Sequence, residues 1–206
     1  MISYTITVCN EHEELERLIQ TLTKYAQDGD EIVVQTDKYN TTDAVREVIN
    51  RHSNLIVTEH PLNGDFATFK NHIQNFCNQP WIFNLDADEM PSPDLLMNIH
   101  NILAENSEIE VFVLPRWNTV AGITDEHVAK WGWRVDEHGR INWPDWQMRI
   151  WRNTPSIHWI NKVHEILTGF ERYTLMPDQE EFCIYHPKTI DKQEKQNELY
   201  SMIVRD

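Results

Sequence analysis

The sequence predicts an α/β fold with a mostly parallel central sheet flanked by helices. Apolar segments of strand length alternate with amphipathic segments of helical spacing through the first half of the chain, which is the pattern of successive β-α-β units. The chain has 206 residues, the size of one compact domain. We therefore expect a single domain over residues 1–206.

The first unit is a strand over residues 2–8 followed by a helix. Asn10 and Glu13 have the spacing of a capping box, so we expect the helix to begin there. Residues 28–30 break the helical pattern, and the apolar run 32–34 predicts the next strand. The inward face of the helix is predicted to carry Leu15, Leu18, Ile19, Leu22 and Ala26.

Two further helices follow in the same pattern. Thr41 or Thr42 is expected to cap the first of them, and residues 55–57 form the third strand. Asn63-Gly64-Asp65 predicts a turn into the second helix. The two inward faces are predicted to carry Ala44, Val45, Val48 and Ile49, and then Phe66, Phe69, Ile73, Phe76 and Cys77.

Pro80 is expected to stop that helix before a strand over residues 81–85. Ser92 as cap, with Pro93 at the first helical position, predicts another helix. A strand over 111–114 closes the first half. The inward face of this helix is predicted to carry Leu95, Leu96, Ile99, Ile102 and Leu103.

The composition and periodicity change beyond Pro115, where tryptophans are frequent and the apolar residues have little helical spacing. Ligands of parallel α/β sheets collect at the carboxyl ends of the strands, so we divide the domain into a nucleotide-binding half over residues 1–115 and a second half with a C-terminal helix over residues 116–206. Seven of the eight tryptophans lie in this second half: Trp117, Trp131, Trp133, Trp143, Trp146, Trp151 and Trp159. We expect a hairpin of 133–135 with 140–142, strands near 148–151, 163–167 and 182–185, and a final helix from about Asp191 that keeps Leu199, Met202 and Ile203 inward.

Composition excludes several classes of protein. The formal net charge of −15 disfavours a nucleic-acid binder, because a phosphate backbone would be repelled. No segment reaches the roughly 20 apolar residues that span a bilayer, and no secretory signal is recognised at the start. Cys9, Cys77 and Cys183 lack the spacing of a metal site or disulfide framework. We expect a soluble, cytoplasmic protein.

The most informative local feature is the segment Asn84-Leu85-Asp86-Ala87-Asp88-Glu89 at the end of an apolar strand. Alternate side chains of an extended chain share a face and lie about 6.6 Å apart, so Asp86 and Asp88 are expected to point the same way. Carboxylates at the carboxyl end of a strand suit Mg²⁺ or Mn²⁺, which completes its shell with phosphate oxygens and water. The alternative is an acidic turn without a ligand.

Four segments, in this order, resemble the glycosyltransferases of family 2, which have the GT-A fold. They are residues 6–11 (Ile-Thr-Val-Cys-Asn-Glu), 32–37 with 41–43, 65–71, and 81–89 with its Asp-x-Asp (DXD) motif. Residues 144–153 and Val163-His164-Glu165 are similar to the family segments on the acceptor side. The resemblance covers most of the chain. It departs from the family at Gln35, where an Asp is usual.

The resemblance implies a GT-A, Rossmann-like domain and a nucleotide-sugar-dependent, hexosyltransferase-like enzyme. The implied reaction is a metal-dependent, inverting transfer from a nucleotide diphosphate donor. The implied cofactors are Mn²⁺ or Mg²⁺ and a UDP-linked sugar. Asp86 and Asp88 would hold the metal. Asp37 and Asn10 would lie near the base or ribose, and Lys70, Asn71 and Arg149 would contribute to the donor site.

A single displacement needs one general base on the acceptor hydroxyl. Asp145 is the first candidate, because desolvation by Trp143, Pro144 and Trp146 is expected to raise its pKa. A turn Asp after Pro144 is the alternative interpretation. Glu165 is the second candidate for the base.

A histidine from the second half could complete the metal shell, and His164 and His186 are both eligible. Arg149, Arg152 and Lys70 could meet the diphosphate, since guanidinium groups match phosphate oxygens, or could be ordinary surface cations. Trp131 or Trp146 is expected to line an acceptor groove.

Two other classes of function remain open from the sequence. A non-catalytic glycan-binding module could use the tryptophans and a structural ion. A sugar nucleotidyltransferase would have a related sheet, but residues 8–12 lack its Gly-rich, basic phosphate loop. The acceptor could be a glycan, a lipid-linked saccharide or another hydroxyl compound.

Overall fold

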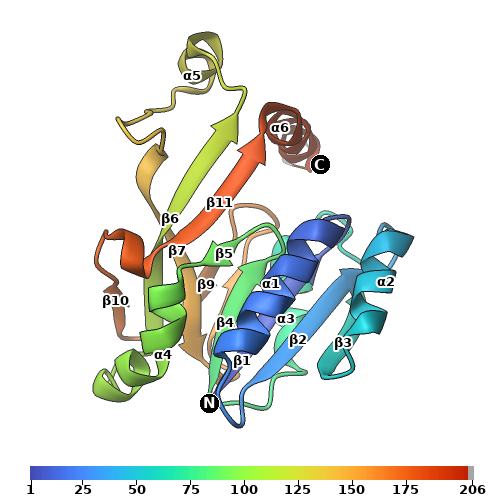
Figure 1. Cartoon of the computed structure of the whole chain (residues 1–206), viewed down its shortest axis with the longest axis vertical. Helices are drawn as coiled ribbons and strands as arrows, with labels where there is room; N and C mark the ends of the chain where they lie inside the picture. The colour runs from blue at the N-terminus through green and yellow to red at the C-terminus, as the bar shows by residue number, and fades with distance from the viewer. Residues whose placement is uncertain (204–206) are drawn as a thin grey trace.

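A single twisted sheet runs through the part of the chain that the computed structural model describes, residues 1–203 (Figure 1). Its strand order is β3-β2-β1-β4-β7-β6-β11-β5, and β10 pairs with β6. The strands are β1 (Ile2–Val8), β2 (Glu31–Asp37), β3 (Leu55–His60), β4 (Trp81–Asp86), β5 (Met90–Pro91), β6 (Val111–Ala121), β7 (Ile141–Arg152), β10 (Tyr173–Leu175) and β11 (Ile184–Thr189). A separate hairpin joins β8 (His158–Ile160) to β9 (Ile166–Thr168).

Helices cover both faces of the sheet. They are α1 (His12–Tyr25), α2 (Asp43–Arg51), α3 (Phe66–Gln74), α4 (Pro93–Glu105), α5 (Asp125–Trp131) and α6 (Ile190–Ile203), with a 3₁₀ turn over Glu180–Phe182. The apolar sides of α1, α2 and α4 pack on one face of the sheet, and α3 with the β8–β9 hairpin packs on the other. The predicted α/β class, with a mostly parallel sheet flanked by helices, is confirmed.

The parallel strands β3, β2, β1 and β4 bring their carboxyl ends to one edge of the sheet. β7 runs antiparallel to both β4 and β6, and β11 then lies parallel to β6. β6, β7 and β11 extend past this edge and carry α5 and α6 beyond it (Figure 1). This extension supplies the second wall of a cleft at the carboxyl ends of the parallel strands.

Of the predicted helix starts, that of α4 is confirmed and that of α1 is wrong. Ser92 accepts a hydrogen bond from the Leu95 N–H at the start of α4, as expected. The capping box of Asn10 and Glu13 does not form. α1 instead begins at His12, and the Glu11 carboxylate turns back to accept the N–H groups of Cys9 and Asn10. Thr42 occupies the cap position of α2 without a side-chain hydrogen bond to the helix.

Other differences concern the lengths of elements. α3 ends at Gln74, so Phe76 and Cys77 lie beyond it, and Phe76 is exposed. The predicted hairpin of 133–135 with 140–142 forms in short form, as one bridge between Val135 and Ile141 with backbone hydrogen bonds from Asn142 to Arg134 and from Asp136 to Arg140. The strand expected over 163–167 begins only at Ile166. α6 forms as predicted, while the inward residues proposed for it, Leu199, Met202 and Ile203, have side chains outside the described set.

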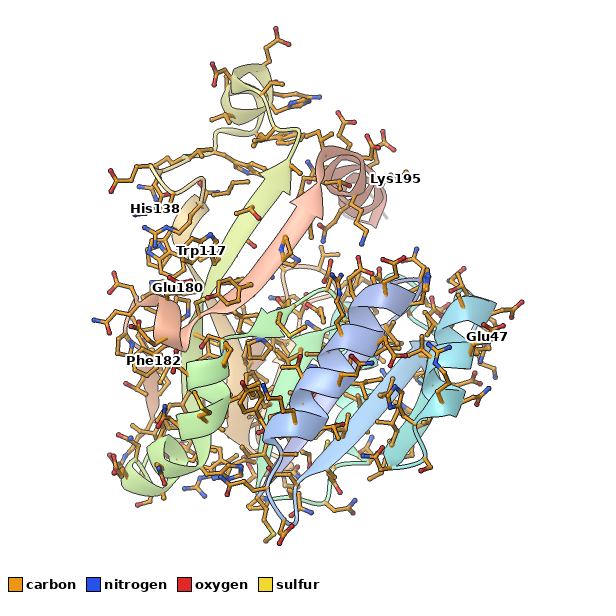
Figure 2. All side chains as sticks on the ribbon, viewed as in Figure 1. Glu47, Trp117, His138, Glu180, Phe182 and Lys195 are labelled. Atoms are coloured by element: carbon orange, nitrogen blue, oxygen red, sulfur yellow. The ribbon has the colours of Figure 1, made fainter. Side chains whose placement is uncertain are left out.

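The aromatic residues of the second half include two groups that contain strand tryptophans. Trp151 and Trp159 are buried against one another with ring planes perpendicular, in the core under α3. Trp117 of β6 contacts Trp143, Tyr185 and His138, and the Arg140 guanidinium lies over both Trp117 and Trp143 (Figure 2). Most of these tryptophans therefore stabilise the fold.

Candidate active site

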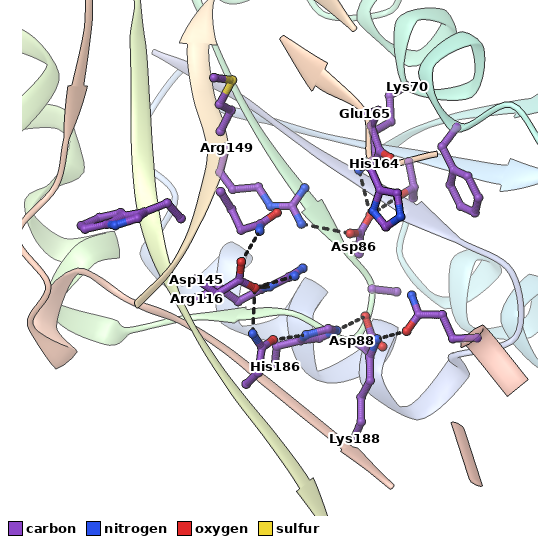
Figure 3. Close-up of a pocket in the computed structure, with 18 of the residues that line it drawn as sticks. Lys70, Asp86, Asp88, Arg116, Asp145, Arg149, His164, Glu165, His186 and Lys188 are labelled. Carbon is purple, nitrogen blue, oxygen red and sulfur yellow. Dashed lines mark hydrogen bonds and ion pairs between the residues drawn. The ribbon is translucent and has the colours of Figure 1, made fainter. Parts of the chain in front are cut away.

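A cleft of about 940 Å³ opens at the carboxyl ends of β1, β2 and β4. Ligands of open α/β sheets bind at this edge, where strand ends and loops present polar groups. The opposite wall comes from β6, β7, β11 and α6. The charged or polar residues that line the cleft include Asp37, Lys70, Asp86, Asp88, Arg116, Asn118, Asp145, Arg149, His164, Glu165, His186 and Lys188 (Figure 3).

Asp86 stands at the end of β4 between two cations. Its Oδ1 accepts the Thr7 hydroxyl at 2.8 Å and lies 3.6 Å from Lys70 Nζ, and its Oδ2 accepts Arg149 Nη2 at 3.1 Å. Burial raises the pKa of Asp86, but the charges of Lys70 and Arg149 and the Thr7 hydroxyl outweigh it and hold the pKa far below its usual range. The side chain remains 33% exposed, so the carboxylate still faces the cleft.

Behind Asp86 lies a fully buried carboxylate, Glu89, that pairs with two arginines. Its Oε1 accepts Arg149 Nη2 at 2.5 Å and Arg116 Nη1 at 3.0 Å. Its Oε2 accepts the backbone N–H of Asp86 at 3.1 Å. Glu89 therefore fixes both guanidinium groups and the turn that carries the Asp-x-Asp motif.

Asp88 points to a different part of the cleft from Asp86 (Figure 3). Its Oδ1 lies 3.6 Å from Nε2 of His186, which is longer than a hydrogen bond. Nδ1 of His186 lies 2.7 Å from the side-chain oxygen of Asn118. Burial and the nearby Arg116 lower the pKa of His186 despite the opposing effect of Asp88, so the ring is neutral at neutral pH.

Asp145 of β7 is paired across the sheet with Arg116 of β6. Its Oδ2 accepts hydrogen bonds from Arg116 Nε at 2.9 Å and Asn118 Nδ2 at 2.7 Å and lies 2.7 Å from Arg116 Nη2, whereas its Oδ1 accepts Gln147 Nε2 at 2.8 Å. Burial raises its pKa, as the sequence predicted, but Arg116 and the amide donors dominate and lower it. The expected upward shift is therefore wrong.

Glu165 meets Lys70 on the opposite side of the cleft. Lys70 Nζ donates to Glu165 Oε1 at 2.6 Å and lies 5.0 Å from the centre of the Trp159 ring. His164, the residue before Glu165, has a positive φ of 53° and also lines the cleft (Figure 3). Of the four predicted metal ligands, Asp88 and His186 face one another. The prediction that Asp86 and Asp88 point the same way is wrong, because β4 ends at Asp86 and the chain turns there. Among the described residues, no cluster of three or more His, Cys, Asp or Glu side chains is arranged to hold a metal ion.

The family model for glycosyl transferase family 2 matches residues 3–182. The chain belongs to glycosyltransferase family 2. This membership confirms the resemblance seen in the four sequence segments. Among curated protein sequences, none matches this glycosyltransferase.

Solved structures share the fold of the glycosyltransferase. S. aureus TarS matches 98% of the chain with a TM-score of 0.61 and 14% identity, and the chain spans 38% of TarS. A TarS fragment, residues 1–349 in complex with UDP, matches 98% with a TM-score of 0.59 and 13% identity, and the chain spans 65% of it. The same fragment in complex with UDP-GlcNAc matches 88% with a TM-score of 0.52 and 13% identity, and the chain spans 60% of it. These likenesses establish the GT-A fold.

Of the residues predicted for the donor site, Asp37 lines the cleft of the glycosyltransferase. β2 runs two residues past Gln35 to end at Asp37, so an Asp does stand at the strand end. Gln35 is buried and holds Phe69 and His72 of α3. Asn10 is exposed and is not among the lining residues.

Two other predicted donor-site residues lie away from the cleft. The Asn71 side chain exchanges two hydrogen bonds with the backbone of Trp159, which fastens the β8–β9 hairpin to α3. Arg152 pairs with Trp81, at the opposite end of the sheet, where it donates to the Ser107 carbonyl. Of the two tryptophans proposed for an acceptor groove, Trp146 lines the cleft and Trp131 packs against His127 and Trp133.

Sequence reasoning missed three polar residues of the cleft, Arg116, Asn118 and Lys188, and the pairing role of the buried Glu89. Their positions depend on how β6 and β11 pair with distant strands. A local signal existed only for Lys188, which follows His186 at the two-residue spacing of a strand and so shares its face. None of the described helices is long and apolar enough to cross a bilayer.

Proposed function

We propose that this glycosyltransferase catalyses a metal-dependent, inverting transfer of a sugar from a nucleotide diphosphate donor to a hydroxyl acceptor. The observation that carries the proposal is the facing pair of Asp88 Oδ1 and His186 Nε2, 3.6 Å apart in the cleft. The described TarS fragment was solved with UDP and with UDP-GlcNAc, which supports a UDP-linked donor here.

The chemistry of the facing pair fits a divalent cation. The Asn118 oxygen can only accept, so the neutral His186 ring carries its proton on Nδ1 and presents the lone pair of Nε2 to Asp88. The lone pair of His186 Nε2 and the carboxylate oxygen of Asp88 repel one another, and a cation bound between them would remove this repulsion. Mg²⁺ and Mn²⁺ commonly take few protein ligands and complete the shell with phosphates and water. When bound, such an ion would neutralise charge on the departing diphosphate.

The remaining cleft residues suit the other parts of the donor. Asp37, Cys9 and Leu62 line one end of the cleft and would receive the nucleoside. Lys188 lines the cleft two residues after His186, and no carboxylate oxygen lies within 4.0 Å of its Nζ among the described side chains. Lys70, Arg116 and Arg149 each contact two carboxylates. Lys188 is therefore the cation we assign to the diphosphate.

Asp145 is the general base in this proposal. Arg116 and Asn118 occupy its Oδ2, but only Gln147 donates to its Oδ1 in the described structure, so Oδ1 retains a lone pair for an acceptor hydroxyl. Arg116 fixes the direction of the carboxylate. Trp146, which also lines the cleft, presents a flat apolar face suited to a sugar ring.

Thermal unfolding with UDP, with and without Mn²⁺, tests the donor and the metal together. We expect UDP to raise the melting temperature only when Mn²⁺ is present, because a ligand that binds the folded state stabilises it by mass action. His186→Ala should abolish the effect of Mn²⁺, and the matched variant His164→Ala should retain it. Absence of a shift with UDP, GDP and dTDP in Mn²⁺, together with no release of sugar from nucleotide donors, would reject the proposal.

A further inference from the structure

Asn118 of β6 lies between the two groups to which the proposed function gives different tasks. On one side its Nδ2 donates to Oδ2 of Asp145 at 2.7 Å, and on the other its Oδ1 lies 2.7 Å from Nδ1 of His186. The contacts reach both neighbouring strands, because Asp145 lies on β7 and His186 is the direct partner of Asn118 in the β6–β11 ladder. Figure 3 shows this chain of contacts continuing from His186 to Asp88.

The orientation of the Asn118 amide follows from its partners. An ionised carboxylate accepts hydrogen bonds and cannot donate, so the group that faces Asp145 must be the amide nitrogen. The amide oxygen then faces His186. Because that oxygen cannot donate either, the short contact requires a proton on Nδ1 of the imidazole.

The proton on Nδ1 determines the state of Nε2, the other nitrogen of the imidazole ring. A neutral histidine with its proton on Nδ1 has a free lone pair on Nε2, which is the atom nearest Asp88. The opposite tautomer would place an N–H on Nε2 and remove the lone pair from the facing pair. Partners of this kind, which orient a ligating histidine through its second nitrogen, raise metal affinity in many proteins.

We propose that Asn118 is a positioning residue that holds His186 with Nε2 free toward Asp88 and, through the same amide, keeps Oδ2 of Asp145 occupied. The inference deepens the proposed function and rests on it, because it takes His186 as a metal ligand and Asp145 as the general base. One amide thereby links the orientation of the proposed base to that of the proposed metal ligand.

The tautomer can be measured directly in the metal-free protein. Nitrogen-15 NMR of the imidazole groups, with His186→Ala to assign the signals, should show the Nδ1–H form of His186 in the wild type. Asn118→Leu, which removes the acceptor, should shift His186 toward the Nε2–H form. A wild-type ring that carries its proton on Nε2 would overturn the inference.

Titration of Mn²⁺ alone into four variants separates positioning from general damage. Asn118→Leu should weaken Mn²⁺ binding by about 10-fold to 100-fold, the usual cost of losing such a partner. Asn118→Asp keeps an acceptor for Nδ1 and should bind Mn²⁺ no more weakly than the wild type, although it loses the donor to Asp145. Gln147→Leu removes a different donor to Asp145 and should leave Mn²⁺ affinity unchanged.

The fourth variant, His186→Ala, distinguishes failure of the positioning role from failure of the metal site. If His186→Ala weakens Mn²⁺ binding and Asn118→Leu does not, the positioning role is wrong and the metal site stands. If His186→Ala leaves Mn²⁺ binding unchanged, the metal site itself is wrong and the role of Asn118 falls with it. Equal weakening by Asn118→Leu and Asn118→Asp, with both variants folded by circular dichroism, would also overturn the proposal, since only one of them loses the acceptor.

Discussion

The ammonium group of Lys70 donates to Oε1 of Glu165 across 2.6 Å, although 95 residues separate them in the chain. The same ammonium lies 3.6 Å from Oδ1 of Asp86, and the Lys70 side chain is only 4% exposed. Lys70 therefore joins α3, the end of β4 and the loop before β9 at a single buried charge. Removing the Lys70 charge leaves the carboxylates of Asp86 and Glu165 with less neutralising positive charge beside them.

Lys70→Met should destabilise the fold by about 3 kcal/mol, because breaking a buried ion pair strands the partner charges. The free energy of unfolding in urea measures the loss. Lys192→Met is the matched control: Lys192 pairs with Glu14 at a similar distance, but its side chain is 44% exposed, so a loss below about 1 kcal/mol is expected. Similar losses in the two variants would show that burial at Lys70 adds nothing.

Acid should destabilise the protein through carboxylates whose pKa the fold holds down. The pKa of Asp86 is lowered because Lys70, Arg149 and Thr7 outweigh the effect of burial, and the pKa values of Asp88 and Asp145 are also lowered. An unfolded Asp titrates near about pH 3.9. The stability that these groups contribute is therefore present above about pH 4 and is lost as the pH falls from there toward the folded pKa values.

Asp86→Asn tests this assignment. At neutral pH the variant should be less stable by about 1.5 to 3 kcal/mol, the range for losing hydrogen bonds to a charged group. Below about pH 4 its free energy of unfolding should fall less steeply with pH than that of the wild type, because one carboxylate no longer takes up a proton on unfolding. Parallel pH profiles of the two proteins would contradict the low pKa of Asp86.

The elements of the fold could be predicted because each depends on local pattern. Strands β1 and β4 follow from apolar runs, and α4 follows from Ser92 and Pro93 before a periodic segment. The side chain of Glu11, by contrast, competes for the backbone donors at the start of α1, and nothing in the local spacing shows which carboxylate prevails. The predicted start of α1 was wrong because this competition between side chains decides it.

The candidate site could be predicted only in part, since long-range strand pairing assembles it. The position of Asp86 and Asp88 at a strand end followed from the apolar run before them. The contact of Asp145 with Arg116 requires the β6–β7 ladder, which contains two register shifts that no pattern in the sequence marks. For the same reason the sequence could not distinguish His186, which β11 brings to Asp88, from His164 on the other side of the cleft.

Lys188 should contribute more to nucleotide binding than any other cation of the cleft. Its Nζ donates to Gln196 of α6, a neutral partner that leaves the charge available to a phosphate. Lys188→Gln should weaken UDP binding in Mn²⁺ by about 10-fold to 100-fold, which corresponds to one charge-assisted hydrogen bond. Isothermal titration measures the affinity, and Lys192→Gln, on the neighbouring helix, should leave it unchanged. Unaltered UDP affinity in Lys188→Gln would assign the diphosphate to other residues.

Asp145→Asn and Glu165→Gln together decide which carboxylate removes the acceptor proton. Both changes keep the shape of the side chain and remove its basicity. If Asp145 is the base, Asp145→Asn should lower kcat for transfer by about 100-fold to 10,000-fold, the contribution of a general base. UDP affinity should stay within about twofold, because no contact to the donor is removed. Glu165→Gln should retain most of the turnover, since its carboxylate is already bound to Lys70. The reverse pattern, with turnover lost only in Glu165→Gln, would move the base to the Lys70 side of the cleft.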